Sequence, residues 1–323
     1  MNREPMDPDV LDRAAGVLLV CACGDALGAG YEFLPPSSIQ APVGMIGGGS
    51  FAWEPGEWTD DTAMAWVIAD VAASGVDLRT VEAQDQITAG WFAWMQEAKD
   101  VGVQTSSALT RAGHEAGGIP TAGHLREAAA RHHEREGRSG GNGSLMRTAP
   151  VALAFLDDPE GLIDAAMQIS ALTHFDPEAG ESCVLQCLAI RHAVLTGELD
   201  LRVGLPALDR RRAELWRSRI DDAEVRTPES FTGNGWCVEA LMGAWSAIAG
   251  STSDVRLPLE AAVQGGHDTD TVAAIAGALV GAKHGARSRS SGGRSCTDGR
   301  ARPGTTWWRS GCGSLRRSPR RDQ

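Results

Sequence analysis

Strand-forming signals are scarce in this sequence of 323 residues. It contains one Tyr and six Phe, and aromatic residues make up only 5% of the chain. Stretches that alternate β-branched and polar residues, which are typical of half-buried strands, are hard to find. These absences argue against a fold built on a β-sheet and leave helices as the main element.

The chain also lacks the segments that would place it in a membrane or outside the cell. No window approaches the unbroken apolar run that a membrane helix needs. The N-terminal stretch MNREPMDPDVLDR is acidic and is broken by Pro5 and Pro8, which is wrong for a secretion signal. We therefore expect a cytoplasmic protein that has no membrane partner.

Cysteine pairs of the metal-binding kind are absent as well. The seven Cys residues form no CxxC pair. Cys183 and Cys187 stand one helical turn apart within an apolar pattern, which predicts buried free thiols. Zinc bound by cysteine is therefore not expected.

Positive charge is scarce except at the C-terminal end. The formal net charge of −12 argues against general nucleic-acid binding through a basic face. Residues 286–323 differ from the rest, because they carry ten Arg, no Lys and only two acidic residues. This Arg/Ser/Gly-rich tail lacks helical periodicity and is predicted to be disordered, or to be the product of a shifted reading frame. A basic arm for nucleic acid is a weaker alternative.

What the sequence does contain, up to residue 285, is helical periodicity. Ala- and Leu-rich runs with apolar residues three and four apart predict helices. The predicted helices span residues 11–29, 61–73, 81–99, 144–156, 162–172, 178–195, 207–220, 236–248 and 269–283. Gly-rich breaks separate several of them, and no Pro/Ser-rich linker divides this part of the chain. We therefore predict one all-α domain over residues 1–285, with the apolar helix 269–283 at its centre.

Two clusters of Thr and Asp stand directly before apolar helices. One is TDDT at residues 59–62, and the other is DTDT at residues 268–271. Helix capping is one explanation, since Thr and Asp are favoured N-caps and an acid in the first turn suits the helix dipole. Capping needs only one such residue, whereas each cluster offers two carboxylates and two hydroxyls beside a helix too apolar for the surface.

Divalent cations would explain both clusters together. Four carboxylates that converge without cations would repel one another and raise one another's pKa values. The donor set is all oxygen, which points to Mg²⁺, Mn²⁺ or Ca²⁺ and away from zinc. Two ions would roughly balance four carboxylates. The sequence thus predicts that the clusters form a single metal centre where two helix starts meet in the core.

Five motifs then carry a resemblance to a known family. They are GDALGAGYEF (24–33), WTDDTAMA (58–65), GNGSLMRTAPVAL (141–153), LTHFDPEA (172–179) and GHDTDTVAAIAGALVGA (266–282). In this order, over residues 10–285, they make the chain resemble the ADP-ribosylglycohydrolases of the dinitrogenase-reductase-activating type. The resemblance implies a compact single-domain orthogonal helix bundle with two Mg²⁺ (or Mn²⁺) ions. It also implies cleavage of the N- or O-glycosidic bond between ADP-ribose and an acceptor.

The resemblance carries over to individual positions of this sequence. The metal ligands that it implies are Thr59, Asp60, Asp61, Asp268, Asp270 and Thr271. Glu32 matches an acid near the substrate's ribose, proposed in some relatives as a base or a gate. The candidates for the acid that takes the proton of the attacking water are Asp61, Asp268 and Glu32, and the sequence leaves the choice open. Asp25 is interpreted as a supporting residue that holds backbone amides near the cleft.

The resemblance also implies a set of substrate-binding residues. These are Gly141, Asn142, Gly143, Ser144 and His174. The glycine-rich loop would approach the diphosphate, and its place before a predicted helix would offer bare backbone N–H groups to a phosphate. An ordinary glycine turn is the alternative. For His174, beside the cleft, the alternative is a helix-end histidine that caps carbonyls.

The predicted activity is metal-dependent hydrolysis that reverses ADP-ribosylation. We expect a monomer that releases ADP-ribose from a protein side chain such as arginine. Serine-linked or nucleic-acid-linked ADP-ribose and O-acetyl-ADP-ribose are alternative substrates, because the same metal site would suit them. A non-catalytic ADP-ribose-binding relative is a further alternative, but such a protein would be expected to lack the aspartates, and all four are present.

Overall fold

Helices form nearly all the regular structure in the computed structural model, which describes residues 7–251 and 254–287. No strand occurs in these ranges, where extended pairing is limited to the isolated bridges Gly48–Trp53 and Gly141–Trp236. The α-helices are α1 (Pro8–Gly28), α2 (Asp60–Ala73), α3 (Val81–Met95), α4 (Val103–Ala116), α5 (Ala122–Glu136), α6 (Ala149–Ala154), α7 (Pro159–Ser170), α8 (Pro177–Thr196), α9 (Arg210–Ala223), α10 (Cys237–Ala249), α11 (Arg256–Gln264) and α12 (Thr269–His284). The 3-10 helices are η1 (Ala29–Tyr31), η2 (Pro36–Ser38), η3 (Asn142–Ser144), η4 (Leu201–Ala207) and η5 (Pro228–Ser230).

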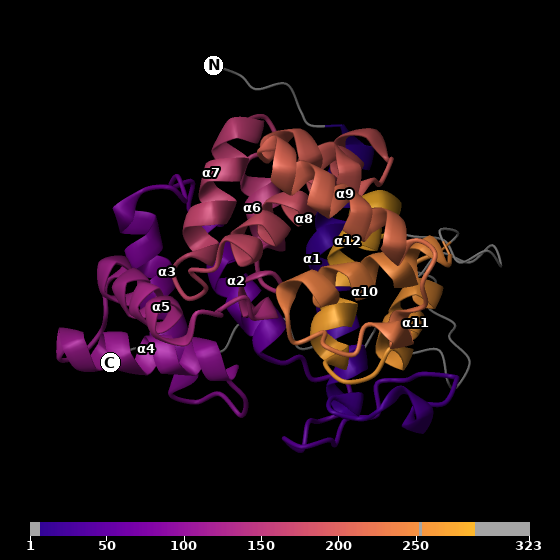
Figure 1. Cartoon of the computed structure of the whole chain (residues 1–323), viewed down its shortest axis with the longest axis horizontal. Helices are drawn as coiled ribbons and strands as arrows, with labels where there is room; N and C mark the ends of the chain where they lie inside the picture. Colours follow the sequence, from indigo (N-terminus) through magenta and orange to yellow (C-terminus); the bar gives the residue numbers. More distant parts are fainter. Residues whose placement is uncertain (1–6, 252–253, 288–323) are drawn as a thin grey trace.

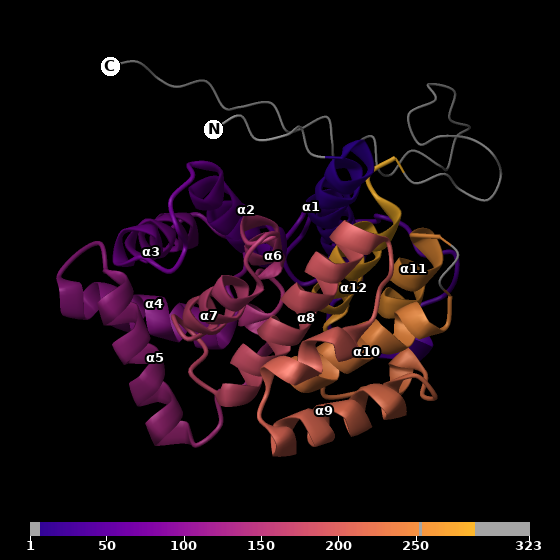
Figure 2. The same ribbon diagram turned by 90° about the horizontal axis from the view of Figure 1, so that it is seen from above.

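Helices α1 and α12 pack against each other along their lengths at the centre of the fold (Figures 1 and 2). Every residue of α12 from Thr269 to Ala282 is buried, which confirms the predicted central position of this helix. Glycine makes the close approach possible. A Cβ on Gly24 would overlap the backbone of Ala273, and one on Gly28 would overlap the backbone at Asp270. The backbones of the two helices therefore touch directly, next to the second Thr/Asp cluster.

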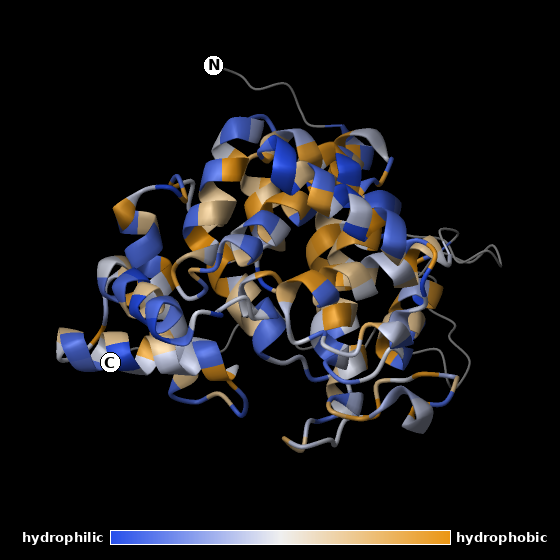
Figure 3. Ribbon diagram, viewed as in Figure 1, coloured by the Kyte–Doolittle hydropathy of each residue, from blue (hydrophilic) through white to orange (hydrophobic). Residues whose placement is uncertain are grey.

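The other helices surround this pair. Helices α3, α4 and α5 lie at one end of the long axis, and α9, α10 and α11 lie toward the other (Figures 1 and 2). In Figure 3 the central helices are largely orange and white, whereas α4 and α5 show more blue. The start of α2 lies between the α3–α5 end and the central pair, and α2 contacts α1, α3 and α12 (Figure 2).

The predicted helices are confirmed, with shifts at their ends and one larger difference. The helix predicted over residues 144–156 is confined to α6, and η3 precedes it. Pro150 lies in the first turn of α6. Because Pro has no backbone N–H, it favours a helix start at this point and not a continuous helix from residue 144.

Among the described residues, three α-helices were not predicted from the sequence: α4, α5 and α11. Each buries only a narrow stripe of small or aliphatic side chains. In α5 the buried residues are Ala122, Leu125, Ala128 and Ala129. The remaining positions of α5 are mostly His, Arg and Glu, so the apolar periodicity is too weak to predict a helix here.

The predicted tail falls almost wholly outside the described residues. Residues 288–323 are among those that the structure does not describe, so the expectation of a disordered or frame-shifted tail stays a prediction. Within the described ranges, the helices are all too short or too polar to cross a bilayer.

Candidate metal centre and active site

The first acid of the site comes from α1. Asp25 is fully buried, and its carboxylate accepts hydrogen bonds from the N–H of Thr59 (2.9 Å) and from the N–H (3.0 Å) and hydroxyl (2.5 Å) of Thr62. These amides belong to the start of α2, where the first N–H groups of a helix have no intrahelical partner. Asp25 therefore attaches the start of α2 to α1, as its interpretation as a support for backbone amides predicted.

Helix capping does not account for the two Thr/Asp clusters. Within the part of the chain that the structure describes, Thr59 at the N-cap of α2 and Asp268 at the N-cap of α12 make no side-chain capping hydrogen bond. The hydroxyl of Thr59 donates to Asp61 (3.0 Å), and Asp268 accepts from the side-chain amide of Asn142 (2.7 Å). Both N-cap side chains are therefore used within the site and not for the helix ends.

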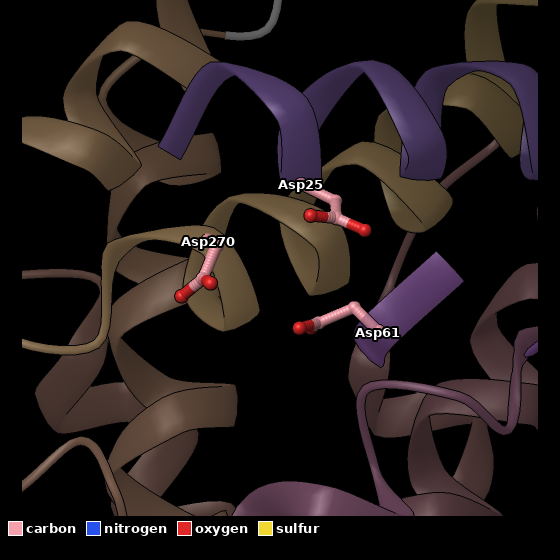
Figure 4. Close-up of side chains that lie close together, drawn as sticks. All are labelled: Asp25, Asp61 and Asp270. Atoms are coloured by element: carbon pink, nitrogen blue, oxygen red, sulfur yellow. The ribbon is translucent and has the colours of Figure 1, made fainter. Parts of the chain in front are cut away.

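The two clusters meet, and acids from two further positions join them. Carboxylate oxygens of Asp25, Asp61 and Asp270 lie within 4.8 Å of one another, and so do those of Glu32, Asp268 and Asp270. Figure 4 shows Asp25, Asp61 and Asp270 projecting toward one another from α1, α2 and α12. The predicted convergence is confirmed for Asp61, Asp268 and Asp270 but not for Asp60, which is in neither group. Because Asp270 belongs to both groups, the site consists of two adjoining carboxylate groups.

Asp25, Asp61 and Asp270 are buried and Glu32 and Asp268 are half-buried, and no basic side chain among the described residues forms an ion pair with them. Burial, with neighbouring carboxylates added, raises the pKa of Asp61 and of Asp270 well above the ordinary value. Burial likewise raises the pKa of Asp25 to about 6 and that of Glu32 to about 9. Every ion pair in the part of the chain that the structure describes involves other residues. Without a cation the site would hold protons at neutral pH.

Two oxygen atoms in the site test whether a metal fits it. Oδ1 of Asp61 and Oε2 of Glu32 are buried and have no hydrogen-bond partner among the described residues. A buried carboxylate oxygen is unfavourable unless a donor or a cation pairs with it. One of these oxygens belongs to each carboxylate group, and the donor set is all oxygen, as hard divalent cations prefer. The residues therefore fit divalent cations of the Mg²⁺ or Mn²⁺ kind.

The remaining predicted ligands lie beside these groups. The hydroxyl of Thr271 donates to Asp61 at 3.5 Å. Asp60 belongs to neither group, and its carboxylate accepts from the N–H of Gly102 (3.3 Å). Burial and the charge of Asp100 raise the pKa of Asp60 to about 8. Asp60 thus contacts the segment before α4, at the edge of the site.

The glycine-rich loop lies directly against Asp268. The side-chain amide of Asn142 donates to Asp268 and to the carbonyl of Asn234 (2.9 Å). The backbone N–H of Asn142 donates to the carbonyl of Gly235 (3.0 Å), so this amide is not bare, contrary to the expectation for the loop. Ser144 is fully buried, and its hydroxyl accepts a hydrogen bond from the hydroxyl of Ser170 (2.9 Å). Its side chain therefore lies in the core.

His174 packs on the same loop. Its ring is buried, with Nδ1 2.7 Å from the hydroxyl of Thr173. A Cβ built on Gly141 or on Gly143 would lie 3.2 Å from Nε2 of His174. The ring therefore contacts a hydroxyl and the glycine loop and is not a cap for helix carbonyls. The structure brings all five predicted substrate-binding positions together, although Ser144 faces inward.

Comparison with known proteins identifies the family. Residues 6–288 match the sequence model of the ADP-ribosylglycohydrolase family. The chain belongs to this family. It is 30% identical to the ADP-ribosylarginine hydrolase Tri1 of Pseudomonas putida (strain GB-1), over 85% of this chain and 71% of that protein. It is also 30% identical to the ADP-ribosyl-dinitrogen reductase glycohydrolase of Rhodospirillum rubrum, over 86% of this chain and 87% of the relative.

A solved structure agrees with this assignment. The chain superposes on an ADP-ribosylglycohydrolase-related protein complex with a TM-score of 0.64 and 27% sequence identity, covering 88% of this chain and 91% of the other. The resemblance inferred from the five motifs and the all-α fold are both confirmed. The protein is thus a glycosidase-type hydrolase of the ADP-ribosylglycohydrolase family.

Sequence reasoning missed three residues around the site of this glycohydrolase. Asp100 is half-buried, and burial with the charge of Asp268 raises its pKa. The side-chain oxygen of Asn234 accepts from the N–H of Asp268 (3.1 Å). Trp236 pairs with Gly141 through an isolated backbone bridge, and the residue is 39% exposed. The segment TGNG was interpreted only as a Gly-rich break, and no motif pointed to Asp100.

Proposed function

We propose that this glycohydrolase uses two divalent cations to hydrolyse the bond between ADP-ribose and an arginine side chain of a modified protein. The observation that carries the proposal is the pair of adjoining carboxylate groups that share Asp270. Asp61 and Asp270, with Asp25 behind them, would hold one ion, and Asp268 and Asp270 would hold the other, with Glu32 beside it. When bound, such cations supply Lewis acidity, which polarises substrate hydroxyls and lowers the pKa of a water molecule.

Glu32 is our choice for the residue that handles protons. Asp25 and Asp268 already accept hydrogen bonds from the start of α2 and from Asn142, whereas Oε2 of Glu32 has no partner in residues 7–251 and 254–287. Glu32 is also only partly buried, unlike Asp61 and Asp270. A bound cation beside Glu32 would lower its pKa from the metal-free value of about 9 toward neutrality, which is the range suited to general acid–base catalysis. This argument favours Glu32 over Asp61 and Asp268.

The proposed reaction exchanges one bond at the anomeric carbon of the ribose. The carbon–nitrogen bond to the arginine guanidinium breaks, and the oxygen of a water molecule bonds to the same carbon, through an oxocarbenium-like state. Glu32 accepts a proton from that water, and a proton is returned to the departing guanidine nitrogen. The products are free ADP-ribose and an unmodified arginine side chain.

The glycine loop (residues 141–144) and His174 form the proposed binding site for the diphosphate of ADP-ribose. Gly141 and Gly143 carry no side chain to cover the backbone between His174 and Asp268. A phosphate can approach such a backbone closely. This placement would leave the ribose over the carboxylate groups, because Asn142 connects the loop to Asp268.

The relatives favour arginine as the acceptor. Two of them, from Pseudomonas putida and Serratia proteamaculans, are named as ADP-ribosylarginine hydrolases. The guanidinium of ADP-ribosylarginine is already protonated at neutral pH and leaves as a neutral guanidine. It therefore needs less acid assistance than an alkoxide leaving group would. Arginine-linked ADP-ribose is therefore the substrate to test first.

A substrate panel with controlled metal content tests the proposal. The full chain is treated with a chelator, and ADP-ribose release from arginine-modified protein is measured before and after adding Mg²⁺ or Mn²⁺. Serine-modified peptide, ADP-ribosylated nucleic acid and O-acetyl-ADP-ribose are assayed in parallel. We expect release from the arginine conjugate only with metal. Full activity after chelation would refute the metal assignment, and release from another conjugate alone would refute the acceptor.

A further inference from the structure

A buried cation lies behind the glycine loop. The guanidinium of Arg147 is fully buried and lies 4.0 Å from the ring centroid of Trp91. No ion pair within residues 7–251 and 254–287 includes Arg147. In these same ranges its Nε has no hydrogen-bond partner, and its Nη1 contacts the sulfur of Met64 at 3.7 Å. Burying a charge without a carboxylate partner destabilises a fold, so this placement needs a specific explanation.

A chain of hydrogen bonds leads from Arg147 to His174. Nη2 of Arg147 donates to Oγ1 of Thr173 (2.7 Å), and the same oxygen lies 2.7 Å from Nδ1 of His174. A guanidinium can only donate, so Thr173 accepts from Arg147, and its own proton is left for Nδ1. Thr173 is fully buried. If Nδ1 carried the ring proton, the hydroxyl proton would have no acceptor, which is unfavourable in a buried position.

This arrangement makes the other ring nitrogen of His174 a donor. Burial and the charge of Arg147 lower the pKa of His174 well below its ordinary value, so the ring is neutral and carries one proton. With Nδ1 accepting from Thr173, that proton lies on Nε2. Nε2 is the nitrogen that faces the loop, 3.2 Å from where a Cβ would lie on Gly141 or Gly143.

We propose that Arg147 and Thr173 are positioning residues, which hold His174 as a neutral Nε2–H donor toward an oxygen of ADP-ribose bound over the glycine loop. The identity of the ligand rests on the proposed function, whereas the hydrogen-bond chain does not. None of the three residues belongs to either carboxylate group, so their role is separate from metal binding. An isolated cation next to the loop is thereby explained as the group that orients the Thr173 hydroxyl.

The substitution Thr173→Val tests the proposal, because it removes the hydroxyl and keeps the side-chain shape. Two readouts are made on the full chain with metal present. Nitrogen-15 NMR of the histidine rings reports the tautomer of His174, and calorimetry reports the affinity for free ADP-ribose. We expect Thr173→Val to show a Nδ1-protonated population and to bind ADP-ribose about tenfold more weakly. Thr173→Ser should restore both properties.

A matched control separates positioning from general loss of a buried hydroxyl. Thr88 is also fully buried, and its hydroxyl has no hydrogen-bond partner among the residues that the structure describes. Thr88→Val should change neither the His174 tautomer nor the affinity. If the Arg147→Met variant folds, it should show the same change of His174 tautomer and the same loss of ADP-ribose affinity as Thr173→Val. If it does not fold, the Thr173 variants alone test the proposal.

Each outcome of these measurements decides a distinct point. An unchanged tautomer in Thr173→Val, or a changed tautomer with unchanged affinity, would overturn the positioning role. Failure of the wild-type protein to bind ADP-ribose would instead refute the proposed function and, with it, the role of His174 as a substrate donor. The tautomer measurement would still report whether Thr173 orients the ring, so the two failures are distinguishable.

Discussion

At the scale of single residues, the acids of this glycohydrolase are held in a state that only a cation or protons can satisfy. Asp61 and Asp270 are buried on different helices, and their carboxylates lie within 4.8 Å of each other. Taken alone, each of these acids would be an ordinary aspartate at the start of a helix, so its residue type does not explain why the two carboxylates lie so close. The chemistry depends on their proximity, and substitutions that remove one carboxylate test it directly.

Asp61→Asn should abolish metal-dependent turnover. Loss of a ligand oxygen at the shared site is expected to lower activity by at least about 100-fold and to weaken metal binding. The metal-free variant should be as stable as the wild type or more stable, because one buried charge is gone. Activity, metal titration and circular dichroism measure these effects. Asp70→Asn is the matched control, since Asp70 is exposed on the same helix, α2. Undiminished activity of Asp61→Asn would remove the basis of the metal assignment.

Glu32→Gln should affect the chemical step more than binding. If Glu32 transfers the proton, kcat should fall by about 10²- to 10⁴-fold. The affinity for free ADP-ribose should stay close to that of the wild type, because Gln keeps the size of the side chain. Single-turnover kinetics together with calorimetry separate the two quantities. A variant with normal kcat would shift the role of base to Asp61 or Asp268.

At the scale of elements, the contact between α1 and α12 sets the spacing of the acids. Gly28 lies against the backbone at Asp270, and Gly24 lies against that at Ala273. Asp25 stands on α1 between these two contacts. The glycines therefore act on the site indirectly, because they allow the backbones that carry Asp25 and Asp270 to touch.

Gly28→Ala should separate the two helices locally and destabilise the protein. A methyl group at this position has rigid backbone in its way, so we expect a loss of about 1–3 kcal/mol or more in the free energy of unfolding, with weaker metal binding. Chemical denaturation and metal titration measure both. Gly123→Ala is the control in α5, where a Cβ would meet only Thr121 Oγ1, at 3.5 Å. That control should be neutral or stabilising by up to about 1 kcal/mol. Equal effects of the two substitutions would contradict this account of the contact.

The helices also show which elements the apolar periodicity of the sequence can predict. Helices with continuous apolar stripes, such as α8 and α12, were predicted nearly to their ends. Helix α5 was missed because its buried stripe consists mainly of alanine among charged residues. A helix is recognised in a sequence by the difference in hydrophobicity between its buried and its exposed face. Small buried side chains such as alanine make this difference small.

At the scale of the whole molecule, metal and protons should compete for the site. The raised pKa values of Asp25 (about 6), Asp60 (about 8) and Glu32 (about 9) mean that the metal-free folded state keeps protons that the unfolded state loses near pH 4. The folded state then binds more protons, so the stability of the metal-free protein should fall as pH rises from about 4 to about 9.

Thermal unfolding with and without metal measures this competition. Saturating Mg²⁺ or Mn²⁺ should raise the melting temperature at pH 8.5 by several degrees more than at pH 5.5, because bound metal replaces the protons. The variant Asp61→Asn should lose most of the difference. A metal-induced shift that is the same at both pH values would contradict the proton competition.

Removal of the C-terminal segment should leave the enzyme active. The family match ends at residue 288, and α12 ends at His284. The chain ending at Ala286 is therefore expected to be soluble and to retain metal-dependent ADP-ribose release. An insoluble or inactive truncated chain would show that residues beyond 286 are needed by the domain.

The sequence by itself determined the helical class, the two Thr/Asp clusters and the family, because these depend on local composition and on short motifs that keep their order. It could not determine which acids share a subsite. Asp25 and Asp270 meet only because α1 and α12 touch through glycine, and Asp100 comes near Asp60 through a loop without a motif. The tertiary structure also decided that Ser144 faces the core and that Thr173 and Arg147 orient His174. Such pairings join residues far apart in the chain, and their energies depend on distance and burial, which local patterns do not encode.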